Sequence, residues 1–223
     1  MERKIQLIIF DLDGTLMNAY PAVEASLNFT LKQLGFPIQS KATIRRAVGW
    51  GDRELLTRFV AEEHLERALK IYRRHHAQAL KTGTRFLPGA KQLISDLRRK
   101  KYKLAVASNR PMRFSLIALK HLKIKKYFDD IRCADQLKHG KPHPQILLQI
   151  LKKLKVSRPE ALYVGDMALD VQTGNRAGVK TVAVLTGSSS PKEIKALKPF
   201  RMIKRISQLT AIIDELNERR TTA

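Results

Sequence analysis

Short apolar runs alternate with helix-period patterns over most of the chain. The first run covers residues 5–10, where Gln6 alone interrupts the apolar side chains. A run of this kind is typical of a strand buried on both faces of a parallel sheet. Similar runs predict further strands at residues 103–107, 131–134, 162–164, 181–185 and 202–203. Helical spacing predicts helices between them, at residues 89–97, 113–122, 144–154, 171–177 and 207–216. Because strands alternate with helices, we expect an α/β fold with a doubly wound parallel sheet.

The pattern changes between the first strand and the second. Apolar side chains recur at helical spacing over residues 21–34, 44–48 and 62–81, and Asp52 is a plausible N-cap for another short helix. No strand pattern interrupts this segment. We therefore predict a small all-helical domain at residues 17–84, inserted into an α/β core made of residues 1–16 and 85–223.

Composition limits the class of protein. The chain has 223 residues, which is enough for a sizeable core. No apolar stretch approaches the roughly 20 residues of a membrane span, and no signal-peptide pattern opens the sequence. The single cysteine, Cys133, cannot form an internal disulfide. We expect a cytoplasmic protein without membrane contact.

The charge balance is unusual, with 43 Lys and Arg against 20 Asp and Glu, a formal net charge of +23. Basic clusters occur at residues 98–101, 123–126, 152–155 and 195–204. They could form a surface for nucleic acid or another polyanion, or they could be solvated helix faces whose field attracts an anionic substrate. No known nucleic-acid motif accompanies them, and aromatic residues are only 6%. This favours the second interpretation, with non-specific polyanion binding left open.

Candidate chemistry begins where the first strand ends. Asp11 and Asp13 flank one apolar residue before Gly14. Aspartate is a poor strand residue, and two carboxylates at the mouth of a buried strand repel each other. A divalent cation or a phosphoryl group would offset that cost. The alternative is an ordinary Asx turn.

Other strand ends carry polar residues too. Ser108 and Asn109 follow the second predicted strand, and Asp166 follows a later one, with Asp170 at the start of the next helix. Lys141 lies in a segment that two prolines restrict. Because the carboxyl ends of parallel strands share one edge of the sheet, we expect these residues to form one site.

Taken together, four motifs resemble those of the haloacid dehalogenase superfamily. They are DLDGT at residues 11–15, SNRP at 108–111, KPHP at 141–144 and GDMALD at 165–170, in the order of that family. The similarity is greatest to its phosphoglycolate phosphatase-like members, partly through the Gly-Trp-Gly turn at residues 49–51. The resemblance implies a Rossmann-like core and identifies the helical insertion as a cap domain. It also implies a cis peptide bond after Lys141.

The resemblance implies a role for each motif. Asp11 would be the nucleophile that forms an aspartyl phosphate, and Asp13 the general acid and then base. Ser108 and Lys141 would hold the transferring phosphate. Mg²⁺ would be the cofactor, and its predicted ligands are Asp11, the backbone carbonyl of Asp13, and Asp166, with Asp170 as a supplementary or indirect ligand. Asp170 could instead be an acid that simply favours the first turn of a helix.

Substrate-binding candidates extend beyond the catalytic set. They are Thr15, Ser108, Asn109, Arg110, Lys141, Arg45 and Trp50. Arg45 could meet a substrate carboxylate or a second phosphate, and Trp50 could either cover the site or pack between helices of the cap. The resemblance assigns no role to His75, His76 or His143.

The retained Asp13 speaks against dehalogenases proper, and Ala22 and Val23 stand where sugar-phosphate mutases carry a histidine. Lys41 does not match the pattern of a Schiff-base lysine. Met17 and Asn18 depart from the residues common after the first motif, which leaves substrate preference open.

We expect a magnesium-dependent phosphatase for a small phosphorylated metabolite, with phosphoglycolate as first candidate, acting as a monomer or homodimer. Alternatives are a pyrophosphatase, nucleotidase or sugar-phosphate phosphatase or mutase, or an inactive module that binds nucleic acid through its basic surface.

Overall fold

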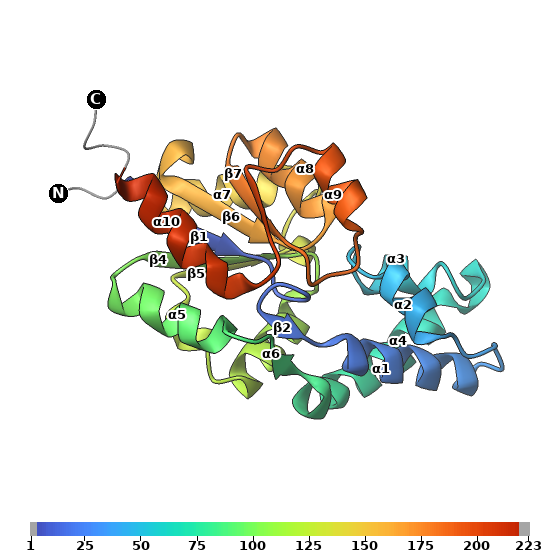
Figure 1. Cartoon of the computed structure of the whole chain (residues 1–223). Coiled ribbons are helices and arrows are strands. Elements are labelled where there is room, and N and C mark those ends of the chain that lie inside the picture. The colour runs from blue at the N-terminus through green and yellow to red at the C-terminus, as the bar shows by residue number, and fades with distance from the viewer. Residues whose placement is uncertain (1–3, 219–223) are drawn as a thin grey trace.

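A six-stranded sheet forms the centre of the computed structural model, which describes residues 4–218 (Figure 1). In sheet order the strands are β5 (Asp130–Cys133), β4 (Lys103–Ser108), β1 (Leu7–Phe10), β6 (Ala161–Gly165), β7 (Lys180–Val184) and β8 (Arg201–Ile203). All neighbouring strands pair in parallel. The predicted parallel α/β sheet is therefore confirmed, with the first strand at its centre.

Helices cover both faces of this sheet. Helices α5 (Ala90–Arg99), α6 (Met112–His121) and α10 (Leu209–Glu218) lie on one face, and α7 (Gln145–Leu154), α8 (Ala168–Ala177) and α9 (Pro191–Ala196) on the other. Side chains of β1 alternate between the two cores: Ile8 and Phe10 pack into one, Leu7 and Ile9 into the other. All four are fully buried, so the apolar run has the two-sided burial that it predicts.

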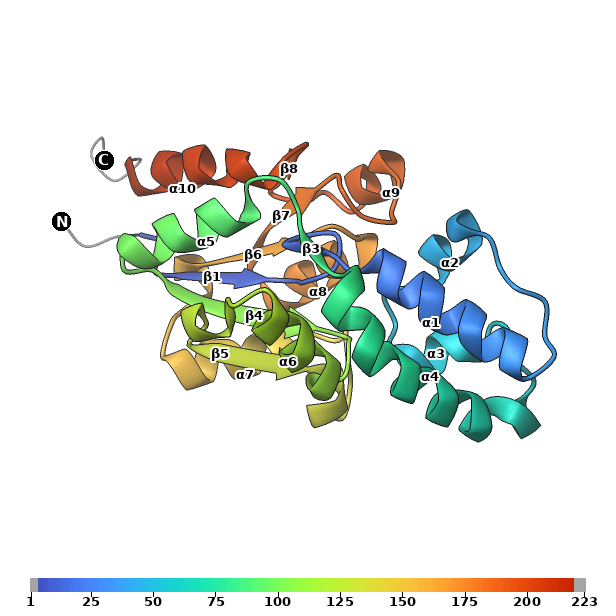
Figure 2. The ribbon, with the colours of Figure 1, turned by 90° about the horizontal axis from the view of Figure 1, so that it is seen from below.

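The helical insertion after β1 has a core of its own, formed by residues 23–72. It contains α1 (Tyr20–Gln33), α2 (Lys41–Ala47), α3 (Asp52–Leu56) and α4 (Glu62–Gly83). Strand arrows of the sheet point toward it, so it stands at the carboxyl edge (Figure 2). Two short strands that pair antiparallel, β2 (Met17–Asn18) and β3 (Arg85–Phe86), join it to the sheet domain.

Three local predictions were wrong. The insertion was expected to hold no strand, but β2 lies at its start, because a two-residue strand is too short to show a period. Asp52 is the first residue of α3 and not its N-cap, which is Gly51 in a positive-φ conformation (φ 98°) that a glycine adopts without strain. The last helix begins at Leu209, after a 3₁₀ turn at Ile206–Gln208. Helix α9 was not predicted at all.

The basic clusters lie at the ends of helices. Four lysines adopt the left-handed conformation there: Lys101, Lys123, Lys155 and Lys198, with φ between 52° and 59°. They follow α5, α6, α7 and α9 and precede β4, β5, β6 and β8. Because these strands are parallel, the residues that precede them lie at the amino edge of the sheet, opposite the helical insertion. Cations near the carboxyl end of a helix interact favourably with its dipole.

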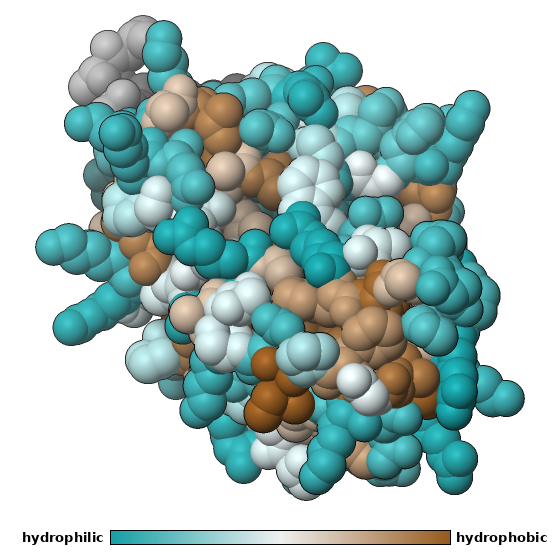
Figure 3. Space-filling model, turned by 90° about the vertical axis from the view of Figure 1, so that its right-hand side faces the viewer, coloured by the Kyte–Doolittle hydropathy of each residue, from teal (hydrophilic) through white to brown (hydrophobic). Residues whose placement is uncertain are grey.

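The surface at the insertion end is mixed. Seen from that side, apolar side chains gather in a patch bordered by hydrophilic ones (Figure 3). Phe29, Ile38 and Trp50 are the large apolar residues of the insertion that are exposed. Within residues 4–218, no helix combines the length and the apolar character needed to cross a membrane.

Candidate active site

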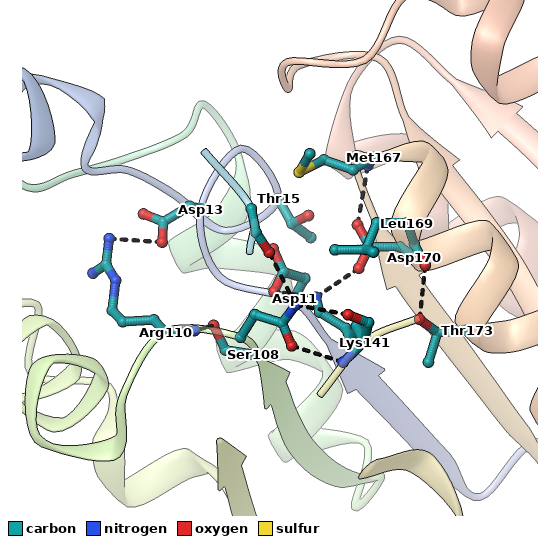
Figure 4. A network of polar contacts seen from close by, with 12 residues as sticks. Asp11, Asp13, Thr15, Ser108, Arg110, Lys141, Met167, Leu169, Asp170 and Thr173 are labelled. Atoms are coloured by element: carbon teal, nitrogen blue, oxygen red, sulfur yellow. Dashed lines mark hydrogen bonds and ion pairs between the residues drawn. The ribbon is translucent and has the colours of Figure 1, made fainter. Parts of the chain in front are cut away.

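The turn after β1 presents two carboxylates at the carboxyl edge of the sheet. The amides of Thr15, Leu16 and Met17 all donate to the carbonyl of Leu12, which folds the chain back at once. Gly14 permits this turn with a φ of 78°. Figure 4 shows the result: Asp11 and Asp13 leave the strand end in different directions, toward different cations.

Lys141 is the cation beside Asp11. Its Nζ donates to Asp11 Oδ1 at 2.8 Å, to Asp170 Oδ1 at 2.6 Å and to the Tyr163 hydroxyl at 3.1 Å. Asn109 fixes the lysine backbone, since its Oδ1 accepts from the Lys141 amide and its Nδ2 donates to the Lys141 carbonyl. The Lys141–Pro142 bond is cis, which confirms the prediction. The lysine is only 5% exposed, so its charge is matched inside the protein.

Tyr163 was missed in the sequence. It lies in β6, and its hydroxyl donates to Asp170 Oδ1 at 2.6 Å. A tyrosine inside a buried strand could have drawn attention, because its hydroxyl needs a partner when buried.

Three carboxylates crowd together behind Lys141. Asp11, Asp166 and Asp170 each offer an oxygen within 4.8 Å of the others, and all three are buried. Burial raises the pKa of Asp11 to about 7, against the opposing pull of Lys141, and it also raises the pKa of Asp166 well above its usual range. Buried carboxylates of this density favour a bound cation.

Asp166 has the free oxygen that such a cation needs. Its Oδ1 accepts from the Thr15 hydroxyl at 2.8 Å, whereas its buried Oδ2 has no partner among the described residues. Gly14 and Gly187 leave the space around it open: a Cβ on either would lie 2.3 or 1.6 Å from Oδ2. This donor set fits a hard divalent cation. The structure also turns Thr15, a predicted substrate ligand, toward Asp166.

Asp170, unlike Asp166, has hydrogen-bond donors at both of its carboxylate oxygens. Its Oδ1 accepts from Lys141 and Tyr163, and its Oδ2 accepts from the amides of Asp166 and Met167 at 3.1 and 3.0 Å. Both oxygens are therefore committed to orienting the lysine and the loop that carries Asp166.

Asp13 pairs with Arg110, whose Nη2 lies 2.6 Å from Asp13 Oδ2 (Figure 4). Burial raises the pKa of Asp13, and the guanidinium opposes this rise. The other carboxylate oxygen, Oδ1, is buried without a partner in the described part of the chain. Asp13 thus has a raised pKa and one free oxygen, as a proton donor requires.

A cavity of about 80 Å³ opens between the strand ends and the insertion. Its sheet-side lining includes the candidates Asp11, Asp13, Ser108, Asn109, Arg110 and Lys141. Of the residues expected at one edge of the sheet, these line one cavity, whereas Asp166 and Asp170 are not among its lining residues.

The two candidates from the insertion lie elsewhere. Arg45 donates to the carbonyl of Thr186 at 3.1 Å and stacks over the Tyr20 ring. Trp50 is 44% exposed. Neither residue is among those that line this cavity. His76, to which the resemblance assigns no role, does line it. Burial lowers the pKa of His76 to about 3, so this histidine is neutral at pH 7.

The parallel sheet, the carboxylates at its strand ends and the helical insertion agree with the family to which the sequence is similar. The chain belongs to the haloacid dehalogenase-like hydrolases, whose family model matches residues 8–184. It is 31% identical to the phosphoglycolate phosphatase of Aquifex aeolicus over 210 residues, 94% of this chain and 97% of that protein. It is 30% identical to phosphoglycolate phosphatase 1 of Pseudomonas aeruginosa, over 96% of this chain and 81% of that one.

A solved structure is similar over nearly its whole length. It is described as a predicted phosphoglycolate phosphatase from Haemophilus somnus, with a TM-score of 0.90, 25% identity, and coverage of 95% of this chain and 99% of that one. The resemblance stated from the motifs is confirmed. Family and relatives together make this protein a phosphatase, a hydrolase of phosphoric monoesters.

Proposed function

We propose that the protein is a magnesium-dependent phosphatase of phosphoglycolate or a closely similar ester, acting through an aspartyl phosphate on Asp11. The observation that carries the proposal is the contrast between the two aspartates of the first motif. Asp11 is held by a lysine beside a buried oxygen of Asp166 that has no partner among residues 4–218. Asp13 lines the cavity, and its Oδ1 is likewise unpartnered among these residues and can carry a proton.

The residues support two successive displacements. Asp11 attacks phosphorus, and the bond to the leaving oxygen breaks while Asp13 gives that oxygen its proton. Asp13 then takes a proton from water, whose oxygen attacks the phosphorus of the aspartyl phosphate. Inorganic phosphate leaves and the Asp11 carboxylate is restored.

The surrounding groups hold the reactants in place. Lys141 orients Asp11 and favours its ionised form. The Ser108 oxygen accepts from the Arg110 amide at 3.2 Å, which leaves its own proton for a phosphate oxygen. Mg²⁺, held by Asp11 and Asp166, would neutralise charge on the phosphoryl group. The helical insertion, residues 17–84, acts in this proposal as a cap over a catalytic core of residues 1–16 and 85–223.

Two observations support a small substrate. The cavity has room for a short ester, and the relatives that match over most of their length are named phosphoglycolate phosphatases. A cytoplasmic location, a monomeric or homodimeric state and weak polyanion binding stay predictions from the sequence.

The test is a phosphate-release panel with and without Mg²⁺. It contains phosphoglycolate, pyrophosphate, a nucleoside monophosphate and a hexose phosphate. We expect Mg²⁺-dependent hydrolysis that favours phosphoglycolate, and a loss of at least about 1,000-fold in Asp11→Asn, because a nucleophile is removed. The matched control Asp214→Asn alters a surface aspartate and should keep full activity. Hydrolysis unaffected by Asp11→Asn would refute the mechanism, and another preferred ester would refute the substrate.

A further inference from the structure

Arg110 is a buried cation with one donor left over. The residue is 9% exposed and lines the cavity. Its Nη2 forms an ion pair with Asp13 Oδ2 at 2.6 Å. Its Nη1 is buried and has no hydrogen-bond partner within residues 4–218. An unpaired N–H of a buried guanidinium is costly, so a partner that arrives with the substrate would be strongly favoured.

The other charges on the cavity wall are already matched. Lys141 directs its three N–H donors to Asp11, Asp170 and Tyr163. Asp52 accepts from the Arg73 guanidinium at 2.6 and 3.2 Å. Among the described lining residues, this leaves Arg110 as the cationic side chain that can receive a further negative charge.

We propose that Arg110 Nη1 binds a carboxylate on the leaving group, so that the enzyme selects phosphate monoesters of small α-hydroxy acids. The inference rests on the proposed function and deepens it. Asp13 must stand next to the ester oxygen to give it a proton, and the guanidinium that holds Asp13 also carries Nη1. The carboxylate therefore lies within a few bonds of the ester oxygen, as it does in phosphoglycolate. A planar fork suits this double task, because its two terminal nitrogens lie apart in a fixed geometry, whereas a lysine offers all its donors from one nitrogen.

The rest of the wall selects against larger anionic leaving groups. Val23, Leu55 and Phe114 supply apolar surface, and His76 beside them is neutral at pH 7. A second phosphate further from the ester oxygen would meet these groups without a partner, at the cost of its hydration.

The experiment compares two esters that differ in one group. Phosphoglycolate carries the carboxylate, and 2-hydroxyethyl phosphate carries a hydroxymethyl group in its place. For the wild type, we expect a kcat/KM at least about tenfold higher for phosphoglycolate. In Arg110→Gln this ratio should fall by about 10-fold to 100-fold, the usual value of a hydrogen bond to a charged group. Arg110→Lys should fall between, and Arg113→Gln, an exposed arginine three residues away, should keep the wild-type ratio.

Two results would overturn the inference while leaving the phosphatase intact. One is a wild-type ratio near one. The other is an equal loss for both esters in Arg110→Gln, which would mean that Arg110 only positions Asp13. If Arg110→Gln does not fold by circular dichroism, the ratio in Arg110→Lys decides, because that variant keeps a charge but lacks the second nitrogen that would reach the carboxylate. Hydrolysis of neither ester by the wild type would instead refute the proposed function.

Discussion

Gly187→Ala tests whether activity and Mg²⁺ binding require the open space beside the Asp166 carboxylate. The added Cβ would lie 1.6 Å from Asp166 Oδ2, 2.4 Å from its Cγ and 2.6 Å from its Cβ. Real Cβ atoms essentially never approach another heavy atom within 3.0 Å, so Oδ2 and the Cβ at position 187 must separate by at least a further 1.4 Å. Rotation of the carboxylate cannot relieve the contact, because the Asp166 Cβ is too close as well. The backbone of Gly187 has no positive φ, so alanine adds no conformational strain of its own.

A displacement of about 1 Å in a catalytic group can lower activity by about 100-fold. We therefore expect Gly187→Ala to lose at least about 100-fold in kcat/KM for phosphoglycolate. Mg²⁺ should also raise its melting temperature less than that of the wild type, since the cation loses the Asp166 oxygen. The first readout is phosphate release across a Mg²⁺ titration, and the second is thermal unfolding with and without Mg²⁺.

Ser188→Ala is the matched control, because it changes the next residue of the same loop by one atom. It should behave as the wild type in both measurements. If Gly187→Ala also keeps its activity and its stabilisation by Mg²⁺ within about twofold, Asp166 does not need its present position and the proposed metal site is wrong.

Two further predictions concern buried charge. Lys141→Met should lower the free energy of unfolding at pH 7 by about 3–5 kcal/mol, because it strands the carboxylates of Asp11 and Asp170. Urea unfolding should show this deficit shrinking as the pH is lowered, since the Asp11 carboxylate, whose pKa is raised by burial, can then take up a proton in the folded state. A pH-independent deficit would contradict the reasoning. His76 acts in the opposite direction on acidification. Its pKa is about 3 when folded and about 6.5 when unfolded, so the unfolded chain binds the extra proton between these values. Unfolding should thus become easier as the pH falls below 6.5, by about 2 kcal/mol at pH 5. His76→Gln should be less sensitive to acid by this amount, and equal sensitivity in the two proteins would exclude a role for His76.

Much of the carboxyl edge of the sheet could be predicted because each strand is a short apolar run that stops at a polar residue. In a parallel sheet, that order along the chain becomes proximity in space, so Asp11, Ser108 and Asp166 are brought together by topology alone. Successive side chains of residues 7–10 point into the two cores in turn. This too could be predicted, because a continuous apolar run is typical of a strand that is buried on both faces.

What could not be predicted depends on contacts between distant segments. Nothing local indicates that Arg110 pairs with Asp13 and keeps Nη1 without a partner among the described residues, or that the Tyr163 hydroxyl donates to Asp170. The orientation of Arg45 and Trp50 depends on how the insertion sits on the sheet domain, which no periodicity encodes. Short elements such as β2 and α9 owe their existence to pairing and packing more than to a pattern of their own.

The four lysines in the left-handed conformation lie at the edge of the sheet opposite the cavity. They gather positive side-chain charge at the amino edge of the sheet, while the buried carboxylates stand at the carboxyl edge. Because the four lysines lie away from the cavity, a change in their charge leaves the residues that line the cavity in place.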